Sequence, residues 1–506
     1  MESETCAAAE LVSVLALGHS KSGIRSVEMC ERWTTMSGNG MREFPPGFVW
    51  GAATASYQIE GAVTEDGRGP SIWDTFSHTP GKVRHGDTGD VACDHFHRLD
   101  EDLDLIAELG IDSYRFSIAW PRIQPDGKGP ANSAGLDFYR RLVGGLRDRG
   151  ITPAATLYHW DLPQALEDAG GWRVRDTSYR FAEYAALCVE SLGDQVGMWI
   201  TLNEPWCSSW LGHAYGYHAP GHRDLGAALA ANHHLLLGHG LAVEALRAST
   251  SAPVGITLNL ANVRSASQHE DDLRAARLVD GVSNRLFLDP IFRAQYPVDM
   301  VEHFEGQMPT IEEGDLTEIS RTLDFLGINY YQPTLVGSRD RIAEHRNAGY
   351  LVDISRPATI VDESLRSVGM HRPGVDRTPM EWEIEPDSLR ELLVNVRENY
   401  TELPIYITEN GCANDDYIAP DGGIHDEERT RYLIGHIGAV HDAISAGVDV
   451  RGYFVWSLMD NFEWSEGYSR RFGITWVDYD SGRRVPKDSF RFYQGVASSN
   501  SVRREP

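Results

Sequence analysis

Residues 198–206 read MWITLNEPW, a short apolar run that ends in polar residues. Its first five residues are mostly branched or aromatic and include no glycine or proline, which is typical of a buried β-strand. Asn203 and Glu204 follow directly. A strand of a parallel sheet is buried along its length, so polar groups gather where it ends. The stretch therefore predicts a carboxyl group held at the end of a buried strand.

Seven further apolar runs share this design. They occupy residues 48–56, 113–118, 152–158, 254–258, 325–330, 405–408 and 453–456. Apolar residues at helical spacing lie between most of them, in residues 100–109, 136–147, 179–192, 227–246, 386–396 and 427–444. Strands that alternate with helices predict a parallel sheet. Eight such units predict an α/β protein with a closed (β/α)₈ barrel rather than a doubly wound sheet.

No linker divides the chain, so we expect a single barrel domain over residues 43–498. An N-terminal extension of residues 1–42, expected to be disordered, and a C-terminal tail of residues 499–506 flank it. Only one long irregular segment is expected, at residues 334–378, which are rich in Arg, Gly and Pro. It lies between the sixth and seventh strands, where a barrel places loops over its active face.

The first residues of the chain bear on its location. The apolar run at residues 11–17 follows acidic residues rather than basic ones and lacks a cleavage pattern, so it does not fit a signal peptide. Met36 and Met41 are alternative starts. The six cysteines are scattered without the spacing of a zinc site or a disulfide framework, which favours reduced thiols. We therefore predict a cytoplasmic protein.

Charge restricts the classes of partner. The chain has 46 basic and 74 acidic residues and a formal net charge of −28. An acidic surface repels phosphate backbones and anionic lipid, so we expect no nucleic-acid and no membrane partner. No apolar run reaches the roughly 18 residues that a membrane-spanning helix needs. The sequence leaves the oligomeric state open, a homo-oligomer included.

Polar or aromatic residues lie at or just after the ends of seven of the predicted strands. The carboxyl ends of barrel strands meet at one face, where catalytic groups lie. Two of these residues, Glu204 and Glu409, carry carboxyl groups, and acetal hydrolysis needs both a proton donor and an anion. A single strand-end glutamate is more often a surface or salt-bridged residue, but two on the same face favour a catalytic pair. The strand-end residues are Gln58, Arg115, His159, Trp160, Asn203, Glu204, Asn329, Tyr331, Glu409, Asn410 and Trp456.

Seven motifs of the chain resemble those of glycoside hydrolase family 1, and they occur in the family's order. The resemblance covers residues 44–496 and is highly specific. The motifs are FVWGAATASYQIEGA (48–62), YRFSIAW (114–120), YHWDLP (158–163), TLNEPW (201–206), GINYY (327–331), ITENG (407–411) and VWSLMDNFEW (455–464).

The resemblance implies a retaining β-glycosidase, similar to bacterial β-glucosidases, that acts by double displacement through a covalent glycosyl-enzyme. Glu204 matches the acid/base and Glu409 the nucleophile. Arg115 and Tyr331 match residues that contact the nucleophile. A nearby guanidinium is expected to hold Glu409 ionised, while the pKa of Glu204 is expected to lie higher.

The resemblance also implies how a sugar is bound. Glu463 is the most informative residue, because a carboxylate can accept two hydroxyl protons at once, as O4 and O6 of a hexose require. Trp456 matches a stacking floor and Trp382 the lining of the leaving-group site. No cofactor and no metal is implied. The predicted substrate-binding set is Gln58, His159, Trp160, Asn203, Asn329, Trp382, Trp456, Glu463 and Trp464.

Several aromatic and histidine residues are expected to have structural roles only. His95, His97, His233 and His234 are predicted to be core or surface residues. Trp50, Trp73, Trp120 and Trp199 are predicted to pack within the barrel.

Three alternatives fit the sequence less well than a β-glucosidase. A 6-phospho-β-glycosidase of the same family replaces the Glu463 carboxylate, which would repel a phosphate dianion. A thioglucosidase lacks the acid/base, and a non-catalytic sugar-binding relative lacks one of the two glutamates; this chain has both. The sequence leaves open the preference among glucose, galactose and fucose, the natural aglycone (cellobiose, plant or aryl glucosides) and the degree of transglycosylation.

Overall fold

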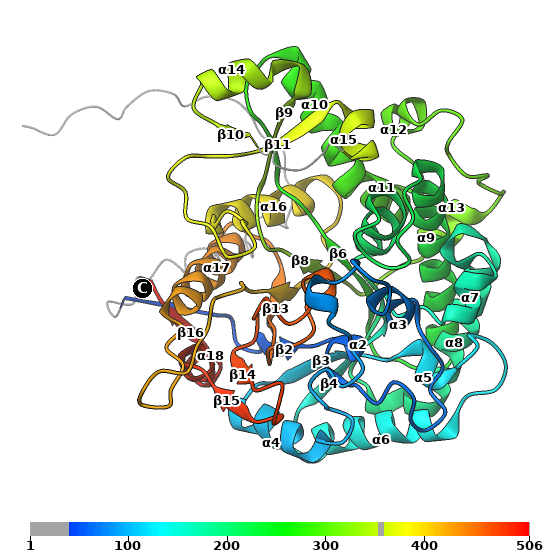
Figure 1. Cartoon of the computed structure of the whole chain (residues 1–506), viewed down its shortest axis with the longest axis vertical. Coiled ribbons are helices and arrows are strands. Elements are labelled where there is room, and N and C mark those ends of the chain that lie inside the picture. The colour runs from blue at the N-terminus through cyan, green and yellow to red at the C-terminus, as the bar shows by residue number, and fades with distance from the viewer. Residues whose placement is uncertain (1–39, 353–358, 505–506) are drawn as a thin grey trace, which may run out of the picture. The chain divides into compact units, whose positions relative to one another are not determined.

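Eight parallel strands close into a barrel in the computed structural model, which describes residues 40–352 and 359–504 of the chain (Figure 1). The strands are β2 (Val49–Ala53), β3 (Ser113–Ser117), β4 (Thr152–Tyr158), β5 (Met198–Asn203), β6 (Val254–Asn259), β8 (Phe325–Asn329), β12 (Ile405–Asn410) and β13 (Val450–Trp456). Their order around the barrel follows the chain, and β13 closes it against β2. The predicted (β/α)₈ barrel is confirmed.

Helices pack around the outside of this barrel (Figure 1). In α6, for example, the buried Leu142, Val143 and Leu146 recur at helical spacing and form one apolar stripe. Each predicted helix lies within an observed one. The main helices are α4 (Leu99–Leu109), α6 (Ser133–Asp148), α8 (Asp176–Leu192), α9 (Leu225–Arg247), α16 (Pro386–Asn399), α17 (Glu427–Ser445) and α18 (Asp488–Ser499).

Alternate side chains of each strand point into the barrel. Met198 and Ile200 of β5 belong to a cluster with Phe325 of β8 and Phe454 of β13. Strands on different sides of the barrel can share a cluster only across its interior, so these residues fill it. Gly51 of β2 leaves room for this packing, since a Cβ there would lie 2.3 Å from the Phe454 ring.

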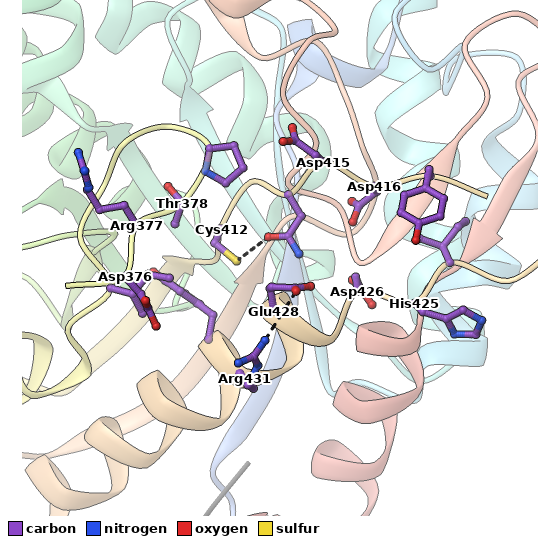
Figure 2. Close-up of a pocket in the computed structure, with 16 residues that line it drawn as sticks. Asp376, Arg377, Thr378, Cys412, Asp415, Asp416, His425, Asp426, Glu428 and Arg431 are labelled. Carbon is purple, nitrogen blue, oxygen red and sulfur yellow. Dashed lines mark hydrogen bonds and ion pairs between the residues drawn. The ribbon is translucent and has the colours of Figure 1, made fainter. Parts of the chain in front are cut away.

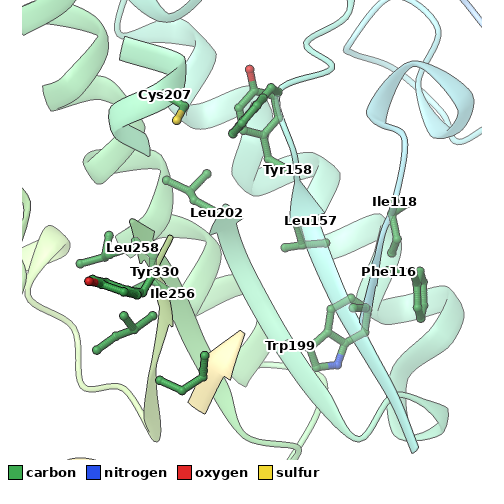
Figure 3. Close-up of a cluster of buried hydrophobic side chains, with 14 of the residues drawn as sticks. Phe116, Ile118, Leu157, Tyr158, Trp199, Leu202, Cys207, Ile256, Leu258 and Tyr330 are labelled. Atoms are coloured by element: carbon green, nitrogen blue, oxygen red, sulfur yellow. The ribbon is translucent and has the colours of Figure 1, made fainter. Parts of the chain in front are cut away.

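The opposite faces of the strands pack beneath the helices. Phe116 of β3, Leu157 of β4 and Trp199 of β5 belong to this outer core (Figure 3). Full burial of a leucine or phenylalanine side chain contributes about 1.5–3 kcal/mol. The predicted packing role of four tryptophans is confirmed, because each is at most 1% exposed; they are Trp50, Trp73, Trp120 and Trp199.

The expectation that residues 334–378 are irregular is wrong. They contribute β9 (Thr334–Ser338), β10 (Leu351–Val352) and β11 (Ser367–His371), which join β7 (Val263–Ser265) in a four-stranded sheet. β7 and β10 have only three and two residues, and glycine interrupts β9 (TLVGS) and β11 (SVGMH). In addition, β7 comes from an earlier loop that sequence periodicity cannot connect to the other strands. The segment also carries two helices, α14 (Ile342–Asn347) and α15 (Ile360–Leu365).

The limits of the predicted domain also differ from the structure. Strand β16 (Ser501–Arg503) pairs with β1 (Met41–Glu43), so the predicted tail of residues 499–506 contains a strand that was too short to predict. The predicted extension lies outside the described residues as far as residue 39. Within the described ranges, no helix combines the length and apolarity that crossing a bilayer requires.

Short elements occupy the remaining connections. They are α2 (Ser56–Ile59), α3 (Ile72–Ser77), α5 (Trp120–Ile123), α7 (Gln164–Asp168), the π-helix η4 (Cys207–Tyr215), α10 (Glu270–Asp280), α11 (Leu286–Arg293), α12 (Val298–His303), α13 (Asp315–Ile319), β14 (Thr475–Val477) and β15 (Arg484–Pro486). The π-helix begins just after Glu204, and such elements are frequent at functional sites.

Candidate active site

Glu204 and Glu409 both lie at the carboxyl ends of barrel strands, as predicted. Glu204 follows β5 and is 5% exposed, and Glu409 lies near the end of β12 and is 3% exposed. Glu204 has a φ of +46°, a left-handed conformation that is uncommon for a residue with a side chain. Its backbone N–H donates to the carbonyl oxygen of Thr257 on β6, at 2.9 Å, which fixes this turn against the barrel.

Charged and hydroxyl donors hold both oxygens of Glu409. Arg115 Nη1 donates to Oε1 at 2.7 Å, and Tyr331 Oη donates to Oε2 at 2.6 Å. Hydrogen bonds to ionised groups are the stronger kind, and they favour the carboxylate form. Gly411 allows the end of this strand to approach the end of β13 closely, because a Cβ there would lie 1.8 Å from the Trp456 carbonyl oxygen. The predicted contacts of Arg115 and Tyr331 with the second glutamate are present.

Neutral donors hold Glu204. Asn329 Nδ2 donates to Oε1 at 2.7 Å, and the Cys207 thiol lies 2.9 Å from Oε2. No ion pair to Glu204 occurs among the described residues. The two glutamates are therefore chemically unequal, since only Glu409 has a cationic partner.

A chain of amide groups joins the surroundings of the two glutamates. Asn203 Oδ1 accepts from Arg115 Nη2 at 2.6 Å and from Asn329 Nδ2 at 3.0 Å. Asn329 Oδ1 in turn accepts from Thr408 Oγ1 at 2.7 Å. Because each donor and acceptor in this chain is occupied, the amides are fixed in one orientation and so is the relative position of the carboxyl groups.

Burial dominates the electrostatics of the pair. It raises the pKa of Glu204 to about 7, and the negative charge of Glu409 adds to that rise. Burial also raises the pKa of Glu409, while Arg115 and Tyr331 oppose the change. As expected, the effect of Arg115 is to lower the pKa of Glu409 and so to favour the ionised form. Of the two groups, Glu204 is the one suited to hold a proton near neutral pH.

Two predicted sugar-binding residues have unused polar atoms. Gln58 Nε2 donates to the Asn461 side chain and to the Phe462 carbonyl, each at 2.9 Å, whereas Gln58 Oε1 is buried without a partner. Asn203 Nδ2 lies 3.1 Å from His159 Nε2, which must accept, so Nδ1 carries the proton and is also buried without a partner. Hydroxyl groups of a sugar can donate to Gln58 Oε1 and accept from His159 Nδ1–H, because a hydroxyl is both donor and acceptor.

Glu463 lies in the same group of carboxyls. Its Oε2 is 3.5 Å from Gln58 Nε2. Burial, followed by the negative charges of Glu409 and Glu204, raises the pKa of Glu463 to about 8. The site thus gathers three carboxyl groups that resist simultaneous ionisation.

Aromatic rings line the same region. The rings of Trp456 and Trp464 each lie 5.9 Å from the His159 ring. Trp382 is half-buried, 5.3 Å from the Tyr331 ring. Trp160, which was predicted to bind substrate, uses its polar atom within the protein, because its indole N–H donates to the Asn203 carbonyl oxygen at 2.9 Å. Its polar atom stabilises the end of β5, so only its ring is available to a ligand.

Sequence reasoning missed two residues of this site. Cys207 contacts Glu204, and its only sequence signal is its position three residues further along a helical turn. Asn461 orients the Gln58 amide. Neither is a residue type that suggests hydrolysis, so only the three-dimensional contacts identify them.

The four histidines predicted to be structural are all hydrogen-bonded to neighbouring elements. His95 contacts Asp102 and His234 contacts the Trp172 carbonyl. His97 contacts two acidic residues and His233 contacts a tyrosine and an aspartate. These partners account for both ring nitrogens of His97 and His233 and for Nδ1 of His95 and His234.

A separate pocket of about 710 Å³ lies beside the start of α17 (Figure 2). Its walls come from residues 376–379, 384, 412, 414–417, 424–426, 428, 431 and 432, and they carry both acidic and basic side chains. Glu204, Glu409 and Glu463 do not line it. Although this pocket is large, it is therefore not the candidate catalytic site, which contains the three carboxyl groups.

A buried carboxyl pair at this face of a (β/α)₈ barrel defines the class of glycosyl hydrolases that act through two carboxyl groups. A model described as glycosyl hydrolase family 1 matches residues 41–502. The chain therefore belongs to glycosyl hydrolase family 1.

Individual relatives agree with this assignment. The chain is 46% identical to beta-glucosidase A of Thermotoga maritima over 464 residues, 91% of this chain and 99% of that protein. It is 47% identical to thermostable beta-glucosidase B of Thermobispora bispora over 497 residues, 98% of this chain and 96% of that protein. The structure of a Thermotoga maritima family 1 β-glucosidase in complex with isofagomine lactam is similar, with a TM-score of 0.84 and 46% identity over 91% of this chain and 100% of that one.

Proposed function

We propose that the chain is a retaining β-glucosidase that releases terminal, non-reducing β-D-glucosyl residues from short β-glucosides. The observation that carries the proposal is the unequal setting of two buried glutamates. Glu409 is held by Arg115 and Tyr331, and Glu204 by neutral donors alone. The names of the relatives, including beta-glucosidase A of Thermotoga maritima, support the glucoside as substrate.

The first half of the reaction uses both glutamates at once. Glu409 attacks the anomeric carbon while Glu204 protonates the glycosidic oxygen. The bond from the anomeric carbon to that oxygen breaks, the aglycone leaves with the proton, and an ester bond joins the sugar to Glu409. Arg115 and Tyr331 keep the attacking oxygens ionised and oriented until the bond forms.

The second half reverses the role of Glu204. Its carboxylate now takes a proton from water, whose oxygen attacks the anomeric carbon and displaces Glu409. Two displacements on opposite faces of the carbon leave the configuration unchanged. The raised pKa of Glu204, about 7, suits a group that must give and then take a proton near neutral pH.

Binding of the sugar is supported by the unused polar atoms. Gln58 Oε1 can accept from a sugar hydroxyl, and His159 Nδ1–H can donate to one. Glu463 offers carboxyl oxygens to further hydroxyls, and the Trp456 ring supplies an apolar face for the pyranose.

The test is to trap the covalent intermediate. A 2-fluoro β-glucoside with a good leaving group forms the glycosyl-enzyme but slows its hydrolysis. We expect mass spectrometry of the digested protein to find one sugar on the peptide that contains Glu409, and none on a Glu409→Gln control. A label on Glu204, or full turnover without any trapped sugar, would overturn the proposal.

We also infer a cytoplasmic location. Within the described residues, four cysteines are buried and unpaired, which favours a reducing compartment; they are Cys93, Cys188, Cys207 and Cys412. Cell fractionation should recover the activity with cytoplasmic markers. Mature protein in the medium would contradict this inference.

A further inference from the structure

A second group of chemically reactive side chains lies away from the three active-site glutamates. Glu167 of α7, His213 of η4 and His222 place one ligand atom each so that all three atoms lie within 4.8 Å of one another. We propose that these residues form a binding site for one divalent transition-metal ion of the zinc type.

His213 is oriented as a metal ligand would be. Its Nδ1 lies 2.8 Å from the Ser208 carbonyl oxygen, which can only accept, so Nδ1 carries the proton. The lone pair is therefore on Nε2, which is buried without a partner in a residue that is 1% exposed. A carbonyl on the far nitrogen is the usual arrangement behind a zinc-bound imidazole.

Glu167 supplies the anionic ligand. Its Oε1 contacts His222 Nε2 at 2.9 Å, while its Oε2 is buried without a partner. Gly171 leaves room for this carboxylate, because a Cβ there would lie 1.9 Å from Oε2. The site thus has two orphan acceptors, Glu167 Oε2 and His213 Nε2, and a cation would satisfy both.

The backbone brings the two histidines together. The carbonyl oxygen of Gly212 accepts from the N–H of Gly221 at 3.2 Å and from that of His222 at 2.9 Å. The imidazole rings lie 5.4 Å apart. These backbone hydrogen bonds fold the chain back on itself and hold His213 close to His222 without a metal.

The donor set indicates the metal. Two imidazoles and one carboxylate are typical of zinc sites that keep a fourth position for water, with metal–ligand distances of about 2.0–2.2 Å. Imidazole favours zinc, copper, iron or nickel over calcium or magnesium. The His222 side chain is 35% exposed, which gives the ion a path from solvent.

One charge opposes the metal. Arg173 Nη2 donates to Glu167 Oε1 at 2.9 Å, and its cation would repel a divalent ion. The Arg173 side chain is 36% exposed, so it can turn to solvent when a metal takes the carboxylate. The arrangement therefore predicts competition between Arg173 and the metal for the same carboxylate.

The experiment measures binding of zinc alone to the full chain, by isothermal titration in a buffer without chelators. We expect one zinc ion per chain at this site, bound about 10-fold or more weakly after His222→Ala or Glu167→Gln. Arg173→Gln should instead bind zinc more tightly. The exposed His425, which contacts Asp421 and Asp488, provides the matched control, and His425→Ala should leave this binding unchanged.

Folding of each variant is checked by its activity on an aryl glucoside. His222 is half-exposed, so its replacement is the variant least apt to unfold the protein. Equal zinc affinity in His222→Ala and the parent would overturn the proposal, and so would absence of binding in large zinc excess. Weaker binding in Arg173→Gln would contradict the proposed competition.

Discussion

Two buried groups of charged residues in this protein differ in their ratio of acidic to basic side chains. The balanced cluster beside the Figure 2 pocket has three acids and three bases: Asp416, Asp426, Asp460, Arg429, Arg471 and Lys487. Arg429 pairs with Asp416 at 2.7 Å, and Lys487 pairs with Asp460 at 2.7 Å. The active site has three glutamates and one cation, Arg115.

The difference separates a structural role from a catalytic one. Although burial opposes it, Arg429 and Lys487 hold the pKa of Asp416 below its usual value. In the active site, burial raises the pKa of Glu204 to about 7 and that of Glu463 to about 8. In the balanced cluster each buried charge has opposite charges beside it that act against burial, although burial still raises the pKa of Asp426. In the unbalanced site one cation acts against the burial of three carboxyl groups, which therefore retain protons that can be transferred.

The largest expected effect comes from removing a charge of the unbalanced group. Glu409→Gly removes the nucleophile, and we expect kcat to fall on the order of 10⁶-fold for every substrate, as for other catalytic nucleophiles.

Glu204→Ala removes the proton donor. With a poor leaving group we expect the rate of the first step to fall about 10²–10⁴-fold, and with dinitrophenolate, which needs no proton, far less. Steady-state and burst kinetics of the variants, with substrates that carry each of the two leaving groups, measure these losses. Equal losses on both in Glu204→Ala would contradict its role as acid.

The balanced cluster should instead respond through stability. Lys487→Met removes one of the two cationic partners of Asp416 and of Asp460 and leaves three buried acids with two bases. We expect the free energy of unfolding to fall by about 3–5 kcal/mol. Lys128 is exposed, so Lys128→Met should change it by no more than about 0.5 kcal/mol. Urea unfolding of both variants measures the difference. A Lys487→Met protein as stable as the parent would show that the balance is not structural.

Glu463→Gln sharpens the same contrast. It replaces a carboxyl oxygen that accepts a sugar hydroxyl with an amide nitrogen that cannot accept, and a buried polar group left without a partner costs about 1–3 kcal/mol, so kcat/KM for β-glucosides should fall about 10–100-fold. The preference over 6-phospho-β-glucosides should narrow most above about pH 8, where the Glu463 carboxyl is ionised and repels the phosphate. The free energy of unfolding should not fall, unlike that of Lys487→Met. A parent enzyme that prefers the phosphorylated substrate would reverse the assignment of Glu463.

The smallest expected effect is a shift in pH dependence. Glu204 must be protonated to act as acid, so kcat/KM should decline as pH rises through about 7. The Cys207 thiol lowers the pKa of Glu204 by donating to the carboxylate. Cys207→Ala should therefore move the alkaline limb upward by less than about one pH unit, while Cys207→Ser retains a donor. A downward shift in Cys207→Ala would contradict the proposed contact.

The sequence allowed the barrel and the two glutamates to be predicted because both depend on local patterns. Most of the barrel strands are rich in apolar residues, and Glu204 and Glu409 lie at the carboxyl ends of theirs. The small sheet of β7, β9, β10 and β11 could not be predicted, since its strands are short and come from separate loops.

The finer features of the site depend on contacts that the sequence does not encode locally. The orphan atoms of Gln58 and His159 become evident only once Asn461 and Asn203 occupy the other ends of these side chains. Likewise, nothing in the spacing of Glu167 relative to the two histidines indicates that they meet.

The division of roles between Glu204 and Glu409 is tested most directly by the stereochemistry of azide products in two variants. In Glu409→Gly, azide can occupy the space of the lost carboxylate and attack the glycoside from that face, which should give an α-glycosyl azide. In Glu204→Ala with dinitrophenyl β-glucoside, the glycosyl-enzyme should form on Glu409, and azide attack from the other face should give a β-glycosyl azide. Opposite anomers from the two variants are the predicted result. The same anomer from both would contradict the division of roles between Glu204 and Glu409.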